Sequence, residues 1–100
     1  MDSNGIFGTN NTMPGQIDLD GATLQGTIKC TYDDLVHAFG EPIDDGNTFS
    51  WLVMFNDYSL AKVYGLKGLL GSVYWDIDGF NKTSFIRVST AVQRSLREAA

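Results

Sequence analysis

The sequence predicts an α+β domain: a four-stranded, mainly antiparallel sheet with two helices on one face, in the order β-α-β-β-β-α, preceded by a flexible N-terminal arm. Three observations lead to this prediction. Apolar and polar residues alternate in four segments, apolar residues recur at helical spacing in two others, and turn-forming residues separate the segments. A chain of 100 residues has room for one domain, which we assign to residues 21–100.

The first strand is expected over about residues 22–30. Residues 1–20 before it show no periodicity and contain several turn-formers, which favours a flexible arm. Within 22–30 apolar and polar residues alternate, as they do in a half-buried strand. Gly26 inside the segment would weaken the strand or mark a bulge.

The first helix is the best-defined element in the sequence. Thr31 offers an N-cap hydroxyl, and Asp34 follows three residues later, near the positive end of the helix dipole. Gly40 supplies a left-handed stop, and Pro42 just beyond it prevents continuation. The apolar face of this helix consists of Tyr32, Leu35, Val36 and Phe39.

A hairpin and a further strand follow. The segment 49–55 is rich in aromatic and branched residues, with Trp51, Val53 and Phe55 on one face. A turn at Asn56-Asp57 leads into a second strand over 59–66. After a glycine-spaced loop, Val73, Trp75 and Ile77 alternate with polar residues up to Gly79.

The last helix begins after Gly79, where Asn81, Thr83 or Ser84 can each provide the cap. Apolar residues then recur at helical spacing, which predicts a helix packed on the sheet. These apolar residues are Phe85, Val88, Val92 and Leu96.

Charge and cysteine content restrict the possible functions. The net charge is −5, and residues 1–79 hold eleven acidic residues against three lysines, whereas residues 80–100 hold four basic residues against one glutamate. A mainly acidic body argues against direct nucleic-acid binding, which needs a cationic face. Cys30 is the single cysteine, so neither an intrachain disulfide nor a cysteine-based zinc site is expected. No signal peptide or membrane segment is recognisable, and we expect a cytoplasmic protein.

The sequence does not predict an enzyme, a cofactor or a metal site. Catalysis by a nucleophile requires a base within reach, and His37 and Cys30 each stand alone in the sequence. Two segments, at 18–21 and 76–79, have the Asp-x-Asp-Gly pattern that begins a calcium loop, but both lack the remaining ligands. We therefore expect these acids to lie in turns or on outward strand positions.

An ordered series of short motifs resembles a known group of proteins. The series consists of Thr31-Tyr32-Asp33-Asp34-Leu35-Val36, Phe39-Gly40-Glu41-Pro42, Trp51-x-Val53-x-Phe55, Ala61-x-Val63-Tyr64-x-x-Lys67 and Trp75-x-Ile77-x-Gly79. It resembles short, mostly uncharacterised proteins encoded by bacteriophages and prophages, over roughly residues 28–80. This chain has a short glycine loop at 65–71 where the group often has a longer insert. The resemblance implies a non-enzymatic inhibitor or modulator of a host protein, including a protein of antiviral defence.

Two sets of residues are candidates for binding. For a host protein, exposed leucines in the glycine loop suggest apolar anchors with an acidic rim. These anchors are Leu66, Leu69 and Leu70, and the rim consists of Asp44, Asp45 and Asp57. The alternative function is sequestration of an anionic nucleotide signal between protomers by basic and aromatic side chains. Its candidate residues are Tyr64, Lys67, Tyr74, Arg87 and Arg94.

Two further hypotheses concern the surface. Paired acids along the chain could imitate the phosphate spacing of a nucleic acid, but an ordinary solvated acidic surface is the preferred explanation. Aromatic residues occupy both faces of the predicted strands, so helices on one side would leave some rings in water. The exposed rings are expected to be some of Trp51, Tyr64, Tyr74 and Trp75. We therefore expect a homodimer or a larger symmetric assembly.

Overall fold

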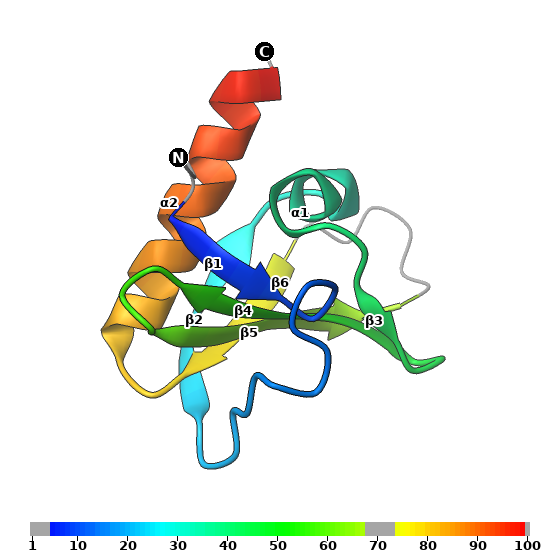
Figure 1. The fold of residues 1–100 in the computed structure, drawn as a ribbon. Coiled ribbons are helices and arrows are strands. Elements are labelled where there is room, and N and C mark those ends of the chain that lie inside the picture. Colours follow the sequence, from blue (N-terminus) through cyan, green and yellow to red (C-terminus); the bar gives the residue numbers. More distant parts are fainter. Residues whose placement is uncertain (1–4, 68–73, 100) are drawn as a thin grey trace.

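The computed structural model describes residues 5–67 and 74–99 and has an α+β fold, with both helices on the same side of an open antiparallel sheet (Figure 1). Its elements are β1 (Ile6–Thr9), β2 (Thr23–Lys29), α1 (Tyr32–Phe39), β3 (Ile43–Asp44), β4 (Thr48–Phe55), β5 (Leu60–Leu66), β6 (Tyr74–Gly79) and α2 (Lys82–Ala99). The four longer strands and both helices lie where the sequence predicts them.

In the described part of the chain the sheet has six strands, so the expected number of four is wrong. The strand order is β1-β4-β5-β6-β2, and β3 also pairs with β4. Every pairing in the described residues is antiparallel. The two unexpected strands share the outer edge of β4, where β1 pairs with residues 53–55 and β3 with residues 49–50. Strands of four and two residues are too short to show a period of their own in the sequence.

Asn10 joins the two halves of this edge. Its backbone N–H donates to the Leu52 carbonyl at 3.0 Å, and its side-chain oxygen accepts from the Leu52 N–H at 3.1 Å. The Asn10 and Asn11 side-chain amides both donate to the Glu41 carbonyl, just before β3. Part of the segment that the sequence assigns to an arm, Ile6–Thr9, is therefore a strand of the sheet.

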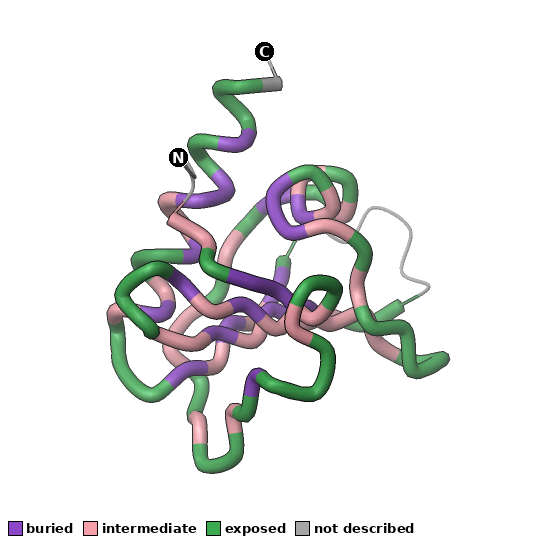
Figure 2. The backbone as a smooth tube through the Cα atoms, in the orientation of Figure 1, coloured by how far each residue is buried: buried purple, intermediate pink, exposed green. Residues whose placement is uncertain are grey.

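The hydrophobic core lies between the sheet and the two helices (Figure 2). The sheet contributes Trp51, Val53, Phe55, Ala61, Val63, Trp75 and Ile77, and the helices contribute Leu35, Ala38, Phe39, Val88, Ala91 and Val92. The alternation predicted for β4, β5 and β6 is confirmed, because these strand residues are all buried while their neighbours along each strand are more exposed.

Two tryptophans attach α1 to the sheet. Their rings meet edge to face, with centroids 5.5 Å apart. The Trp51 indole N–H donates to the Gly40 carbonyl at 2.8 Å, and the Trp75 indole N–H donates to the Cys30 carbonyl at 2.9 Å. Because Cys30 and Gly40 lie just outside the two ends of α1, the buried indoles fix both ends of the helix.

The caps of α1 form as predicted. The Asp34 N–H donates to the Thr31 hydroxyl at 3.1 Å, and the Thr31 N–H donates to the Asp34 carboxylate at 2.9 Å. Gly40 ends the helix with a φ of +85°, which favours glycine, and its N–H donates to the Val36 carbonyl. These contacts are local in sequence, which is why the sequence predicts this helix well.

Of the two alternatives for Gly26, a weakened strand or a bulge, the structure favours the bulge, because the pairing of β2 with β6 shifts register between Leu24 and Gly26. A Cβ atom at Gly26 would lie 2.5 Å from the Phe85 ring of α2. The glycine therefore also allows α2 to pack directly against the backbone of β2.

The long helix α2 starts on the sheet and extends beyond it (Figure 1). Asn81 caps it by accepting the Thr83 N–H at 2.9 Å. Farther along, a hydrogen bond between the Ser95 hydroxyl and His37 Nδ1 joins α2 to α1. Within the described residues, no helix is long and apolar enough to cross a membrane.

Candidate functional site

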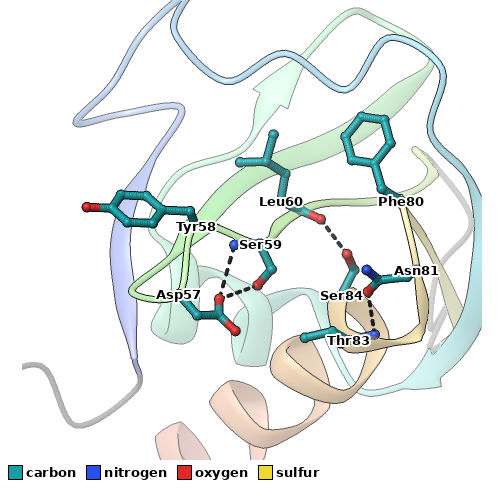
Figure 3. A pocket seen from close by; sticks show the side chains of 8 residues that line it. All are labelled: Asp57, Tyr58, Ser59, Leu60, Phe80, Asn81, Thr83 and Ser84. Carbon is teal, nitrogen blue, oxygen red and sulfur yellow. Dashed lines mark hydrogen bonds between the residues drawn. The ribbon is translucent and has the colours of Figure 1, made fainter.

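The side of the sheet opposite the helices is the most varied surface of the molecule. On β5 and β6 it carries half-buried polar and aromatic side chains, because they alternate with the core residues. These side chains are Lys62, Tyr64, Asp76 and Asp78. The segment between β1 and β2 runs along this side of the sheet (Figures 1 and 3) and buries Ile17.

An open pocket of about 400 Å³ lies at one end of the sheet. The β4–β5 turn forms one wall, and the junction between β6 and α2 forms the other (Figure 3). We call it the aromatic pocket. Its lining residues are Asp57, Tyr58, Ser59, Leu60, Phe80, Asn81, Thr83 and Ser84.

The polar groups on the helix side of the pocket are engaged with one another. The Asp57 carboxylate accepts from the Ser59 hydroxyl at 2.6 Å and from the Ser59 N–H at 3.0 Å, and it pairs with Arg87 at 2.8 Å. These hydrogen bonds, first those of Ser59 and then that of Arg87, lower the pKa of Asp57 to about 2. The Ser84 hydroxyl donates to the Leu60 carbonyl at 2.5 Å. These hydrogen bonds therefore fix the polar side chains of this wall in place.

The apolar rim of the pocket faces solvent. Tyr58 is 72% exposed and Phe80 is 53% exposed. In Figure 3 the Leu60 and Phe80 side chains project to the same side of the sheet, away from Ser84 and Thr83. Phe7 of β1 is also exposed, and its ring centroid lies 6.1 Å from that of Tyr58. Phe7 and Tyr58 thus form an exposed aromatic pair beside one wall of the pocket, and Phe80 is exposed on the other wall.

Tyr58 has the backbone conformation that bulky residues avoid. Its φ is +67°, and it is the single non-glycine residue with a positive φ among the described residues. The turn is held by the Tyr58 N–H, which donates to the Phe55 carbonyl at 2.8 Å, and by the Phe55 N–H, which donates to the Ser59 carbonyl at 2.9 Å. A strained conformation of this kind persists only where surrounding bonds impose it.

An acidic strip, which we define as Tyr64, Asp76 and Asp78, adjoins the aromatic pocket on the same side of the sheet. The Tyr64 hydroxyl donates to Asp78 at 3.1 Å, and the Thr27 hydroxyl of β2 donates to Asp76 at 3.1 Å. Burial, followed by the hydrogen bond to Asp78 and the charges of both carboxylates, raises the pKa of Tyr64 to about 12. The strip therefore carries two carboxylates, each of which accepts a hydrogen bond from a hydroxyl group.

The groups considered for catalysis lie elsewhere. Cys30 is buried beneath α1, where desolvation and then the charge of Asp34 raise the pKa of its thiol to about 12. His37 lies between the helices and bonds to Ser95. In residues 5–67 and 74–99, no three His, Cys, Asp or Glu side chains gather closely enough to hold a metal ion. The aromatic pocket can hold an apolar group, with polar hydrogen-bonding groups along one side.

The candidate residues for partner binding lie at two ends of the sheet. Leu66 is exposed at the end of β5, near the β3–β4 turn. In that turn Asp44 pairs with Lys67 at 2.6 Å, and Asp45 accepts the Thr48 N–H at 2.7 Å. Asp57 lies at the opposite end of β4, in the aromatic pocket. Leu69 and Leu70 lie outside the described residues.

The residues proposed for nucleotide sequestration are also separated. Lys67 pairs with Asp44 at one end of the sheet, and Arg87 pairs with Asp57 at the other. Tyr64 belongs to the acidic strip, where a nucleotide phosphate would meet two carboxylates. The remaining two residues are Tyr74, which is exposed at the start of β6, and Arg94, which lies on α2.

The rings expected to support a homodimer differ in their exposure. Trp51 and Trp75 are buried beneath the helices, so of the four rings considered only the two tyrosines lie on the uncovered face. Tyr64 is half-buried on that face, and Tyr74 is 63% exposed. Assembly stays a prediction that rests on Tyr74 and on exposed apolar residues outside the strands.

Sequence reasoning missed the aromatic rim. Tyr58 falls within the predicted hairpin turn, and Phe80 falls between the last strand and the last helix, so neither belongs to a periodic segment. Small polar residues are usual in turns, so a large aromatic residue in each of these two turns could have indicated the site.

No family model, curated protein or solved structure matches this chain. The resemblance to phage-encoded proteins therefore rests on the sequence motifs alone.

Proposed function

We propose that this chain is a non-enzymatic binding protein that captures another protein at the aromatic pocket. The observation that leads to this proposal is the conformation of Tyr58, which is both strained and 72% exposed. A bulky residue with a left-handed backbone costs roughly 1–2 kcal/mol, and glycine or asparagine would avoid most of this cost. A ring held outward at such a cost is expected where another molecule covers it.

The neighbouring residues support the same function. Tyr58 and Phe80 line the pocket and Phe7 adjoins Tyr58, and burying each exposed ring on binding would contribute about 1.5–3 kcal/mol. Aromatic anchors surrounding a pocket are typical of the small set of residues that dominates the affinity of an interface. The paired Asp57 and Arg87 behind the rim keep the turn in place without presenting an unpaired charge.

The resemblance to phage-encoded proteins suggests the origin of the partner. Such proteins act inside a bacterial host, so we propose that the captured molecule is a host protein, which this chain inhibits or modulates by occupying its surface. This mode of action requires no reaction at the site. It requires only that the interface be large enough to compete with the partner's natural ligand.

Affinity capture from a bacterial lysate, followed by quantitative mass spectrometry, tests this function. The test compares the unchanged chain with the double variant Tyr58→Ser/Phe80→Ser, and uses Leu66→Ser as a control at the opposite end of the sheet. We expect a specific set of proteins that is retained by the control and lost with the double variant. Circular dichroism establishes that both variants are folded. Equal capture by the double variant would show that the pocket is not the binding site.

A further inference from the structure

We infer that the partner presents a basic segment, with an apolar side chain in the aromatic pocket and lysine or arginine side chains over the acidic strip. This inference rests on the proposed function, because it specifies the chemistry of the molecule that occupies the same site. Three observations support it. The pocket and the strip lie on one face, the carboxylates of the strip form no ion pair in the described residues, and covering such carboxylates without a cation is unfavourable.

The pocket and the strip form one continuous surface. In the β5–β6 pairing, Lys62 lies opposite Asp78 and Tyr64 lies opposite Asp76. Leu60 and Phe80 each lie two residues farther toward the pocket, and therefore on the same face. Two residues of a strand span roughly 6.6 Å, so Asp78 lies about 7 Å and Asp76 about 13 Å along the surface from the pocket.

The carboxylates of the strip lack a cationic partner within the described residues. Lys67 pairs with Asp44 and Arg87 pairs with Asp57, and neither pair includes the strip. Lys62 lies next to Asp78 in the pairing, but its ammonium group is directed over the Tyr64 ring, 5.2 Å from the centroid. Among the residues that the structure describes, Asp76 accepts a hydrogen bond from the Thr27 hydroxyl and Asp78 accepts one from the Tyr64 hydroxyl.

Further carboxylates lie on this side, whereas Lys29 and Lys62 on the same side direct their ammonium groups over the rings of Tyr74 and Tyr64. Asp18 and Asp20 are exposed on the segment that runs along this side of the sheet, and the Asp20 N–H donates to the Asp18 carboxylate at 2.9 Å. The charges of Asp76 and Asp78 contribute to the raised pKa of Tyr64, after burial and the hydrogen bond to Asp78. An approaching segment that fills the pocket must therefore come close to several carboxylates.

These charges select the occupant. A partner that covered Asp76 and Asp78 with apolar or acidic groups would remove the carboxylates from water without compensation, which is strongly unfavourable. Lysine or arginine would neutralise them, and a guanidinium group could bond to Asp78 while lying against the Tyr64 ring. In an extended segment, the first basic residue would lie two positions after the apolar anchor, and the second would lie two positions after the first. This spacing matches that of Phe80, just after β6, and of Asp78 and Asp76 along β6.

A titration followed by nuclear magnetic resonance tests this charge preference. The probes are the acetylated peptide Phe-Thr-Lys-Thr-Lys and two analogues with either glutamate or serine in place of both lysines, each added to the ¹⁵N-labelled full chain. We expect the lysine peptide to shift the amide signals of Asp76, Asp78 and Phe80. Its affinity should exceed that of the serine peptide by roughly tenfold, and the glutamate peptide should not bind.

Isosteric variants identify the charges responsible. Asp76→Asn and Asp78→Asn should each weaken binding of the lysine peptide by roughly threefold to tenfold, whereas Asp33→Asn, on α1 on the other side of the sheet, should leave it unchanged. Raising the salt concentration should reduce the difference between the lysine and serine peptides.

The possible failures are distinguishable. If the serine peptide binds as tightly as the lysine peptide, the charge inference is overturned while the pocket remains a binding site. If the lysine peptide binds the strip and Phe80→Ser has no effect, the proposed role of the pocket is overturned and the charge inference stands. If no peptide shifts any signal of the pocket or the strip, both are overturned.

Discussion

Two buried tryptophans stabilise the fold, whereas the exposed Tyr58 destabilises it. Trp51 and Trp75 satisfy their indole N–H groups inside the core, so their burial leaves no polar group unpaired. Tyr58 is the opposite case, because its ring lies in water and its backbone is strained. The tryptophans are explained by the stability of the fold. The strained backbone and exposed ring of Tyr58 are not, and they require a functional explanation.

Replacing Tyr58 by either glycine or alanine measures this strain. At ordinary positions alanine is more stable than glycine by about 0.5–1 kcal/mol, because glycine loses more backbone entropy on folding. At a φ of +67° the order should reverse, with Tyr58→Gly more stable than Tyr58→Ala by roughly 1 kcal/mol. Urea unfolding of both variants gives the difference. An alanine variant as stable as the glycine variant would show that this position is not strained.

Two turn aspartates make stability depend on acid pH. Hydrogen bonds within their turns lower the pKa of Asp45 and of Asp57 from the ordinary value of 3.8 to about 2. The folded state favours their ionised forms, so their contribution is complete above pH 3.8 and is lost as the pH falls toward about 2. Urea midpoints measured across this range should fall less steeply for Asp45→Asn and Asp57→Asn. An unchanged slope in both variants would contradict the assignment.

At the scale of elements, the outer edge of β4 explains why six strands form where four are expected. The edge is divided between β1 and β3, and Asn10 fills the position between them by bonding to Leu52 and to the Glu41 carbonyl. Two short strands leave little continuous free edge for pairing with another chain. The N-terminal segment therefore protects the sheet.

Asparagine variants test this arrangement. Asn10→Ala leaves the Leu52 N–H without its acceptor and should lower the free energy of unfolding by about 1–3 kcal/mol. Asn11→Ala is the matched control, since it loses a more exposed bond to the Glu41 carbonyl and should cost less than about 1 kcal/mol. Denaturant unfolding measures both. Equal losses would mean that Asn10 has no special role at this edge.

The limits of sequence-based prediction follow from the same contacts. The helix α1 is predictable because Thr31, Asp34 and Gly40 act within a few residues of one another. The strands β1 and β3 are not, because they depend on pairing with β4, and for β1 on Asn10, which bonds to Leu52 far along the chain. The aromatic pocket lies between the β4–β5 turn and the β6–α2 junction, which are close because β5 and β6 are neighbours in the sheet. The strand order cannot be predicted from the sequence, so neither can the pocket.

At the scale of the whole molecule, exposed apolar residues also lie at the end of the sheet away from the pocket. Leu66 and Tyr74 each lie two residues beyond the paired Tyr64 and Asp76, so they share a face and an end of the sheet. A homodimer is expected to use this end and to leave the aromatic pocket free. Light scattering should give about twice the chain mass of 11.0 kDa, and Tyr74→Ser should reduce it to the chain mass. A strict monomer at tens of micromolar would contradict this expectation.

The central claim is that one end and one face of the sheet bind a partner protein, and hydrogen exchange of the captured complex tests it most directly. Binding should slow exchange of backbone amides in the β4–β5 turn, at the start of α2 and along β6, because the partner excludes water from these segments. The Leu66 end of β5 and the outer surface of α1 serve as internal references and should exchange as in the free chain. Protection confined to residues 43–48 and 64–67, with none at residues 57–60 and 80–84, would contradict the account.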